Sequence, residues 1–257
     1  MIIHPIKAFS DNYIWAIHQK KDAGLIVVDP GDAKPVIAYI NANGLRLDAI
    51  LITHYHHDHI GGVNELKNKY HCPVYGSSYD NLECCDHYLS DQDRLNLWSG
   101  QLNFELLHVP GHTLGHIAYH DSQKKLLFCG DTLFRAGCGR MFEGEPEQFY
   151  NSLKTLANLP IDTQVYCTHE YTLSNLAFAQ HIEPSNHDIK QLLQECKALR
   201  EKDLVTLPSN LASELKCNPF LRCHIPSVSE SVKQLANVNV KKEYEIFASM
   251  RRLKDNF

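Results

Sequence analysis

Residues 52–62 of the chain read ITHYHHDHIGG, a stretch that brings four potential metal ligands within six residues: His54, His56, Asp58 and His59. The apolar run Ala49–Ile52 leads into it and has the pattern of a buried strand, so His54 and His56 are expected on the loop at the strand end. In an extended segment, residues i and i+2 point to the same side. Four polar groups packed side by side are costly unless something pairs with them. We therefore expect one metal ion at the His54/His56 pair and a second at Asp58 and His59.

Three further apolar runs also end at a side chain that can bind a metal ion. These runs, each with the ligand that follows it, are Phe104–Val109 with His112, Leu126–Cys129 with Asp131, and Val165–Cys167 with His169. In layered α/β folds, ligand sites assemble at the ends of strands, so this recurrence predicts one site for two metal ions. Imidazole and carboxylate ligands at this density suit Zn²⁺, with Fe or Mn as other candidates.

The composition and net charge of the chain exclude several other classes of protein. The chain has 257 residues, 44% apolar and 21% charged, which is ordinary for a globular protein. The net charge of −5 argues against nucleic-acid binding, and no run of about 18 apolar residues is present to span a membrane. The nine cysteines contain no C-x-x-C pair, so neither a disulfide framework nor cysteine-bound zinc is expected. The first residues lack the pattern of a secretory leader, and we expect a cytoplasmic monomer.

Strands and helices alternate over the first two thirds of the chain, which indicates an α/β fold. Helical patterns cover residues 34–41, 62–69 and 147–157 between the apolar runs. After about residue 170 helices dominate, with apolar residues at helical spacing in 174–182, 189–201 and 243–254. We therefore predict a metal-binding catalytic domain over residues 1–170 and a mainly helical substrate-binding domain over residues 171–257.

The motifs THYHHDH with GG following, PGHTLGH, GDTLF and THEYT resemble the metallo-β-lactamase superfamily. Within it, the chain is most similar to the glyoxalase II (hydroxyacylglutathione hydrolase) family, from FSDNYIW and VVDPGD near the start to NPFLR and MRRLKDNF at the end. The metal motifs are shared by many activities. The segment GDTLFRAGCGRMFEG, the THEYT motif and the RRLKDNF ending are the features typical of glyoxalase II.

This resemblance implies an αββα metallo-β-lactamase-like sandwich with a C-terminal helical subdomain. It implies one metal ion held by His54, His56 and His112, a second held by Asp58, His59 and His169, and Asp131 as the bridge between them. The implied reaction is hydrolysis of S-D-lactoylglutathione to D-lactate and glutathione, the second step of methylglyoxal detoxification. The glutathione moiety would be held by Arg140, Tyr171, Arg251 and Lys254.

The substrate segment departs from the family in detail. Arg140 stands where some relatives have Lys, and a guanidinium can bind a carboxylate in a bidentate manner. Phe142 stands where some relatives have Tyr, so any hydrogen bond from that hydroxyl is missing. Arg251 and Lys254 are three residues apart and share one face of the predicted last helix. That face is suited to hold one of the two carboxylates of glutathione.

The expected mechanism uses water rather than a side chain as the nucleophile. Two metal ions about 3.5–4 Å apart can share a bridging water and lower its pKa toward neutrality. We expect the bridging hydroxide to attack the thioester carbonyl, with Asp58 orienting it and Asp131 holding both ions. A thiolate leaves readily, since thiol pKa values lie near about 8.5. Asp29 in VVDPGD and His116 are candidates for orienting a ligand histidine.

Three alternatives remain open at this point. The first is another dinuclear metal hydrolase on the same scaffold, such as a lactonase, another thioesterase, a β-lactamase or a nuclease. The second is a redox di-iron protein, which His56 and the chain length oppose, because such proteins typically carry Glu at that position and an added flavin domain. The third is a closed structural metal site, which would have four ligands and no open position. Seven ligands shared by two ions leave coordination positions open for water, which argues against a closed structural site.

Overall fold

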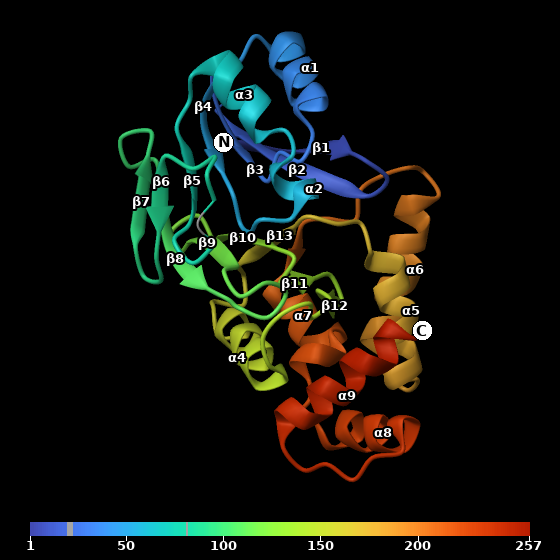
Figure 1. The fold of residues 1–257 in the computed structure, drawn as a ribbon. Helices are drawn as coiled ribbons and strands as arrows, with labels where there is room; N and C mark the ends of the chain where they lie inside the picture. Colours follow the sequence, from blue (N-terminus) through green and yellow to red (C-terminus); the bar gives the residue numbers. More distant parts are fainter. Residues whose placement is uncertain (20–22, 81) are drawn as a thin grey trace. The chain divides into compact units, whose positions relative to one another are not determined.

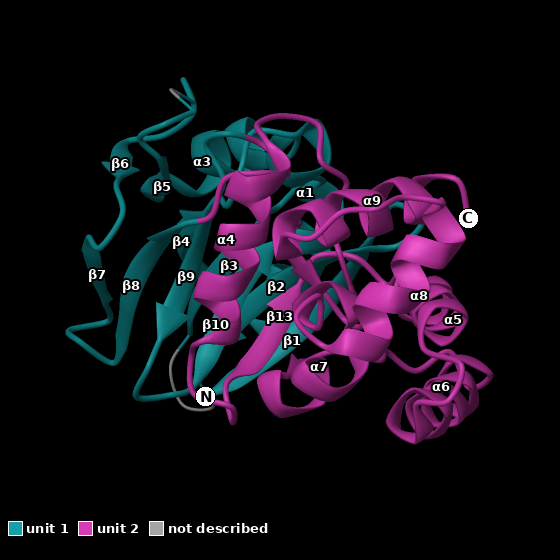
Figure 2. Cartoon of the chain, turned by 90° about the horizontal axis from the view of Figure 1, so that it is seen from below, with its two compact units in different colours: residues 1–108, 114–130 teal, residues 109–113, 131–257 magenta. Residues whose placement is uncertain are grey.

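The computed structural model describes residues 1–19, 23–80 and 82–257. The chain forms two compact units, one of residues 1–108 and 114–130 and the other of residues 109–113 and 131–257 (Figure 2). The predicted domain boundary at residue 170 falls inside the second unit and stays a prediction.

The first unit begins with a mixed sheet in the order β1-β2-β3-β4-β5-β6. Its strands are β1 (Ile2–Ala8), β2 (Asn12–His18), β3 (Gly24–Val28), β4 (Arg46–Leu51), β5 (Val74–Ser77) and β6 (His87–Leu89). β1 to β3 pair antiparallel, and β3 to β6 pair parallel. Parallel neighbours end at the same edge of a sheet, so the segments after β3 and β4 meet there. The Asp29 amide accordingly donates to the Leu51 carbonyl at 2.9 Å.

Two helices, α1 (Ala33–Asn43) and α3 (Val63–Tyr70), cover one face of this sheet (Figure 1). Alternate strand residues point to each face. Leu25 and Val27 of β3 therefore share a core with the helices, through Val36 and Leu66. Both helices confirm the predictions for residues 34–41 and 62–69.

A second sheet of the first unit is an antiparallel meander in which each strand pairs with the next. Its strands are β7 (Arg94–Leu97), β8 (Leu102–His108), β9 (Ile117–Asp121) and β10 (Leu126–Gly130). Phe104 packs edge to face against both Tyr119 and Phe128 in its core. The Tyr119 hydroxyl donates to the Ile52 carbonyl at 2.8 Å. This bond ties the second sheet to the residue just after β4, where the ligand-rich stretch begins.

The second unit is mainly helical. Its strands are short and pair as β11 (Leu133–Phe134) with β12 (Gly137–Cys138), and β13 (Gln164–Cys167) with β14 (Ser209–Asn210). Its helices are α4 (Pro146–Ala157), α5 (Thr172–Ile182), α6 (His187–Arg200), α7 (Leu211–Cys217), η1 (Pro219–Leu221), α8 (Pro226–Ala236) and α9 (Glu243–Asp255). The helices predicted at 147–157, 174–182, 189–201 and 243–254 are confirmed as α4, α5, α6 and α9.

Helices α5, α6 and α7 share a small apolar core within the second unit. Ile189, Leu192 and Cys196 of α6 are buried in it against Leu176 and Ala179 of α5. The Asn186 side chain caps α6 by accepting from the amides of Asp188 and Ile189. Among the described residues, no helix has the length and apolar character needed to span a bilayer.

Candidate metal centre

The ligand-rich stretch lies where β4 gives way to the short helix α2 (His57–Ile60). His56 is the N-cap residue of this helix, with extended backbone angles of φ −60° and ψ 144°. His54 and His56 therefore lie on the loop before the helix, while Asp58 and His59 lie in its first turn. The local arrangement expected from the sequence is the one observed.

Gly62 allows this loop to pack closely against the turn after β3. A Cβ added at Gly62 would lie 2.4 Å from the Ala33 nitrogen and 2.7 Å from the Pro30 carbonyl oxygen. The Gly62 amide also donates to that carbonyl at 2.9 Å. Any side chain here would push the ligand loop away from the turn that carries Asp29.

His54 and His56 form the first pair of donors. His54 Nε2 lies 3.0 Å from His56 Nδ1. The Thr53 hydroxyl donates to Asp29 Oδ2 at 2.7 Å, so it accepts from His54 Nδ1, 3.1 Å away. This relay keeps the His54 proton on Nδ1 and leaves the lone pair on Nε2, the nitrogen that faces His56.

Asp58 and His59 form the second pair. His59 Nδ1 donates to Asp29 Oδ2 at 3.0 Å, which leaves Nε2 with its lone pair. That nitrogen lies 3.5 Å from Asp58 Oδ2, which also accepts from the Asn12 side-chain amide at 2.9 Å. Asp29 is buried and reaches both pairs, directly through His59 and through Thr53 to His54. The role expected for it as an orienting group matches these contacts.

The second unit carries the other three candidate ligands, His112, Asp131 and His169, all at most 6% exposed. Asp131 Oδ2 lies 3.5 Å from His112 Nε2 and 3.3 Å from His169 Nε2. His112 Nδ1 donates to the Arg140 backbone carbonyl at 2.7 Å, so its Nε2 carries the lone pair. Asp131 thus presents one carboxylate oxygen to two imidazole nitrogens.

The separations between donor atoms test whether these residues fit a metal ion. Two ligands of one tetrahedral Zn²⁺, each about 2.0–2.1 Å from the ion, are roughly 3.3–3.4 Å apart. The four donor pairs described above are 3.0, 3.5, 3.5 and 3.3 Å apart. His54, His59 and His112 each have the second ring nitrogen anchored, as metal-binding histidines normally do. The donor set therefore fits divalent metal ions, Zn²⁺ among them.

The four predicted substrate residues lie in the second unit and differ in exposure. The Arg140 side chain is largely exposed, and the half-exposed Tyr171 ring stacks on His169 at 4.7 Å between centroids. Lys254 Nζ donates to the Ser174 carbonyl and hydroxyl at 3.1 and 2.9 Å. Partial burial and the nearby Arg251 guanidinium lower the pKa of Lys254 to about 8. Arg251 is only 7% exposed.

Two buried residues that support the β11–β12 hairpin were not found by sequence reasoning. Glu214 accepts from the Ala136 amide at 2.8 Å, and the Asn218 side chain donates to the Gly137 carbonyl at 2.8 Å. Burial raises the pKa of Glu214. Asn218 is the first residue of the NPFLR segment that resembles the family, and Glu214 lies four residues before it. The NPFLR segment was the available signal for Asn218, whereas a glutamate in the mixed segment LASELKC gives no sign that it is buried.

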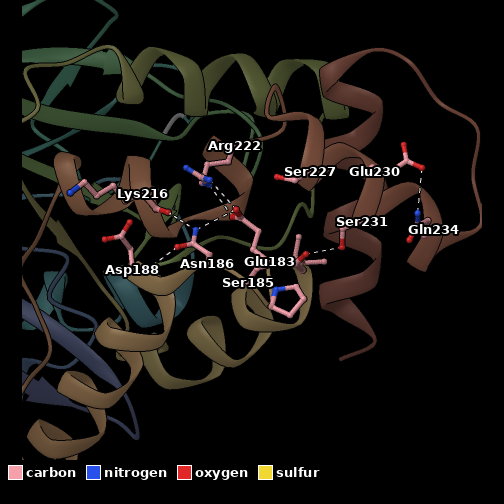
Figure 3. A pocket seen from close by; sticks show the side chains of 12 residues that line it. Glu183, Ser185, Asn186, Asp188, Lys216, Arg222, Ser227, Glu230, Ser231 and Gln234 are labelled. Carbon is pink, nitrogen blue, oxygen red and sulfur yellow. Dashed lines mark hydrogen bonds and ion pairs between the residues drawn. The ribbon is translucent and has the colours of Figure 1, made fainter.

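A hollow of about 640 Å³ lies beside the turn between α5 and α6, and none of the predicted site residues lines it (Figure 3). Arg222 reaches across it to Glu183 with two hydrogen bonds of 2.9 Å. Asn186 donates to the Lys216 carbonyl at 3.0 Å on the same wall. These contacts join side chains and backbone of the second unit along the lining of the hollow.

Comparison with known proteins matches the chain from end to end. The metallo-beta-lactamase superfamily model matches residues 10–169, and the model of the hydroxyacylglutathione hydrolase C-terminus matches residues 170–257. Hydroxyacylglutathione hydrolase of Pseudomonas aeruginosa (strain LESB58) is 49% identical over 257 residues, with 99% of each chain covered. The enzyme of Nitrosomonas europaea is 44% identical over 255 residues, covering 99% of this chain and 96% of its own.

Solved structures agree on the fold. ETHE1 from Myxococcus xanthus is 24% identical, with a TM-score of 0.66, and the match covers 99% of this chain and 98% of that one. TTHA1623, solved in a di-iron-bound form, is 26% identical with a TM-score of 0.60, over 85% of this chain and all of its own.

The chain is a member of the metallo-beta-lactamase superfamily, and the predicted α/β fold class with its helical C-terminal region is confirmed. The superfamily and the histidine and aspartate clusters support a divalent metal site. The full-length identity to the curated relatives and the match of its C-terminal part show that the chain belongs to the hydroxyacylglutathione hydrolase family within that superfamily.

Proposed function

We propose that the protein hydrolyses S-D-lactoylglutathione to D-lactate and glutathione, the second step of methylglyoxal detoxification. The observation that carries this proposal is the similarity over both parts of the chain. Residues 10–169 match a superfamily with many activities, whereas residues 170–257 match the C-terminus of hydroxyacylglutathione hydrolase in particular. The identity of 49% over the full length supports the same substrate.

For the metal ions we propose the ligand set that the family resemblance implies. One ion would be held by His54, His56 and His112, the other by Asp58, His59 and His169, and Asp131 would bridge them. The anchored tautomers of His54, His59 and His112 support this set. Zn²⁺ is our first candidate, and Fe or Mn also suit these ligands.

When bound, two divalent ions supply an activated water and stabilise negative charge that develops on the thioester oxygen. The chain's own residues prepare that chemistry. Asn12 holds the Asp58 carboxylate in a fixed orientation through Oδ2, and we propose that Asp58 directs the attacking water. Thiolate is a good leaving group at neutral pH, so no strong general acid is required.

For the glutathione moiety we propose contacts from Arg140, Tyr171, Arg251 and Lys254, all of which lie in the second unit. Arg140 and Lys254 offer cations for the two carboxylates of the tripeptide. The Phe142 ring lies 5.9 Å from the Arg140 guanidinium, so it lends a cation–π contact in place of the hydroxyl that a Tyr would offer.

For the compartment we propose the cytoplasm, and for the assembly a monomer. None of the nine cysteines forms a disulfide, which is compatible with a reducing compartment. The expectation that neither nucleic acid nor membrane is a partner rests on the acidic net charge and the absence of an apolar span in the sequence.

The test is an activity assay on purified, zinc-loaded protein with S-D-lactoylglutathione, beside a lactone, a β-lactam and a phosphodiester. We expect fast thioester cleavage that a chelator abolishes, and little action on the other three substrates. If the protein holds its metal ions yet cleaves the lactone much faster than the thioester, the lactonase alternative replaces this proposal.

A further inference from the structure

Cys84 and Cys85 are neighbours in the segment between β5 and β6, and they differ from the other cysteines of the chain. All nine cysteines lie in the described part of the chain; eight are buried, and Cys84 alone is partly exposed. Burial raises the pKa of thiols such as those of Cys138 and Cys167, which makes them poor nucleophiles. At the Cys84–Cys85 pair, by contrast, solvent reaches one thiol that has a second thiol beside it.

The backbone around this pair is held by both β5 and α3. The Asp86 amide donates to the Val74 carbonyl at 2.9 Å, and the Val74 amide donates to Asp86 Oδ2 at 2.9 Å. On the other side, Lys67 Nζ donates to the Cys84 carbonyl at 3.0 Å and lies 2.6 Å from Asp86 Oδ1. These contacts fix the segment in place and bring a cation next to the two thiols.

The two thiols are bound to each other, with the more exposed one as the acceptor. A hydrogen bond from the Cys85 side chain, together with the Lys67 charge, lowers the pKa of Cys84, and the same bond raises the pKa of Cys85. The Cys85 sulfur lies over Gly76 of β5, where an added Cβ would come within 2.5 Å of it. Since the thiolate is the reactive form of cysteine, Cys84 is the nucleophile of the pair and Cys85 is held beside it.

We propose that Cys84 and Cys85 form a reversible oxidation site, at which hydrogen peroxide converts the two thiols into a disulfide between neighbouring residues. The Cys84 sulfur attacks one peroxide oxygen and the O–O bond breaks, which gives a sulfenic acid and one water. The Cys85 sulfur then attacks the Cys84 sulfur. The S–S bond forms, the S–O bond breaks, and the oxygen leaves with the Cys85 proton as a second water. Two thiols are oxidised while one peroxide is reduced, so atoms and electrons balance.

A disulfide between neighbouring residues is readily reduced again. The Cα atoms of such residues are about 3.8 Å apart across a trans peptide, less than the roughly 4.4 Å at which ordinary disulfides begin. The resulting strain makes the bond easier to reduce, as in regulatory disulfides. Closure of the disulfide also removes the sulfenic acid before further peroxide can carry it to the irreversible sulfinic acid. The candidate metal ligands are histidines and aspartates, so this site goes beyond the proposed function and does not depend on it.

The experiment treats the full-length, zinc-loaded protein with a small excess of hydrogen peroxide at neutral pH. Remaining thiols are then blocked with iodoacetamide in denaturant, and the chain is cut after glutamate. Cleavage after Glu83 and Glu105 releases a peptide whose only cysteines are Cys84 and Cys85. In mass spectra we expect this peptide to be lighter by two hydrogen atoms and to carry no alkyl group. Dithiothreitol before the block should restore alkylation of both thiols.

Two results would overturn the proposal. If both thiols of the peptide are still alkylated after peroxide, the pair is not an oxidation site. If Cys84 reaches the sulfinic acid while Cys85 is still alkylated, the two sulfurs do not close a disulfide. Neither result depends on whether the protein cleaves S-D-lactoylglutathione.

Serine variants separate the roles of the two thiols. Cys85→Ser should stop the reaction at the sulfenic acid, which dimedone then labels on Cys84. Cys84→Ser should leave Cys85 reduced at the same dose of peroxide, and oxidation of Cys85 in that variant to the same extent would contradict the role given to Cys84. Cys72→Ser is the matched control, because Cys72 is buried and burial raises its pKa to about 11. This variant should form the disulfide as the unchanged protein does.

Discussion

The Asp29 carboxylate accepts a hydrogen bond from the His59 ring at 3.0 Å, and both side chains are buried. Asp29 directly follows β3, whereas His59 lies in the helix after β4, so the bond joins the ends of two parallel neighbours. The backbone of Asp29 adopts a left-handed φ of 54°, which is uncommon outside glycine but more frequent for Asp, Asn and His than for other residues. A left-handed residue whose side chain orients a candidate ligand is a feature often found at functional sites.

Replacement of Asp29 by Asn should weaken binding of the ion that His59 helps to hold. An amide offers one accepting oxygen, whereas the carboxylate receives the Thr53 amide and hydroxyl and the His59 ring together. We expect a loss of affinity of about tenfold to hundredfold for that ion, measured by chelator competition. Asp32→Asn is the matched control, because Asp32 only caps α1 and Asn caps equally well. Equal affinities in the two variants would contradict the role given to Asp29.

Replacement of Asp131 by Ala should damage both metal positions, while replacement of Asp58 by Ala should damage one. Asp131 Oδ2 faces two imidazoles, and Asp58 Oδ2 faces only His59 among the donor pairs described. Zinc content after dialysis, measured by atomic emission, should fall below one ion per chain in Asp131→Ala and approach one in Asp58→Ala. An Asp131→Ala protein that keeps two ions and full activity would show that Asp131 does not bridge.

The candidate ligands could be predicted from the sequence because each one follows an apolar run, and buried strands deliver their last residues to one edge of a sheet. The Thr53 relay could not be predicted in the same way, because a threonine after a strand is ordinary in many proteins. Thr53 has this role because Asp29, which lies 24 residues earlier in the sequence, accepts a hydrogen bond from its hydroxyl. The contact of Arg251 with Gly139 spans 112 residues and uses a backbone carbonyl, which every residue has.

The same reasoning explains which helices and strands could be predicted from patterns in the sequence. Helix α6 was predicted because it carries a stripe with Ile189, Leu192 and Cys196 at helical spacing. Helix α8 was not, because Val228 and Val232 are its only buried residues among seven polar or small neighbours in PSVSESVKQLA. Strands β11, β12 and β14 have two residues each, too few to show any period.

Activity should depend on the protonation of Lys254. Partial burial lowers its pKa to about 8, so the ammonium is present below that pH and is lost as the pH rises through it. If Lys254 holds a carboxylate of the substrate, KM should rise above pH 8 while kcat changes less. The rise should be at most about tenfold per pH unit, because a single group loses a single proton. Steady-state kinetics between pH 6.5 and about 9.5 would measure this. Lys254→Arg stays charged throughout and should flatten the rise; a rise of the same size in that variant would assign the dependence to another group.

Stability should depend on the ion pair in the hollow of Figure 3 rather than on the metal ligands alone. Arg222 binds Glu183 through two hydrogen bonds, and the two side chains are only 20% and 7% exposed. Removing one partner of such a pair leaves a charge desolvated, so Glu183→Gln should lower the free energy of unfolding by about 3 kcal/mol. For a chain of this size that corresponds to a fall in Tm of roughly 6–12 °C.

Glu230→Gln is the control, because Glu230 lines the same hollow but only accepts an exposed, 3.4 Å hydrogen bond from Gln234. Calorimetry on zinc-loaded proteins should separate the two variants, with metal content unchanged in both. If Glu183→Gln instead has the same Tm as Glu230→Gln but binds the thioester more weakly, the hollow takes part in substrate binding and the ion pair does not act on stability alone.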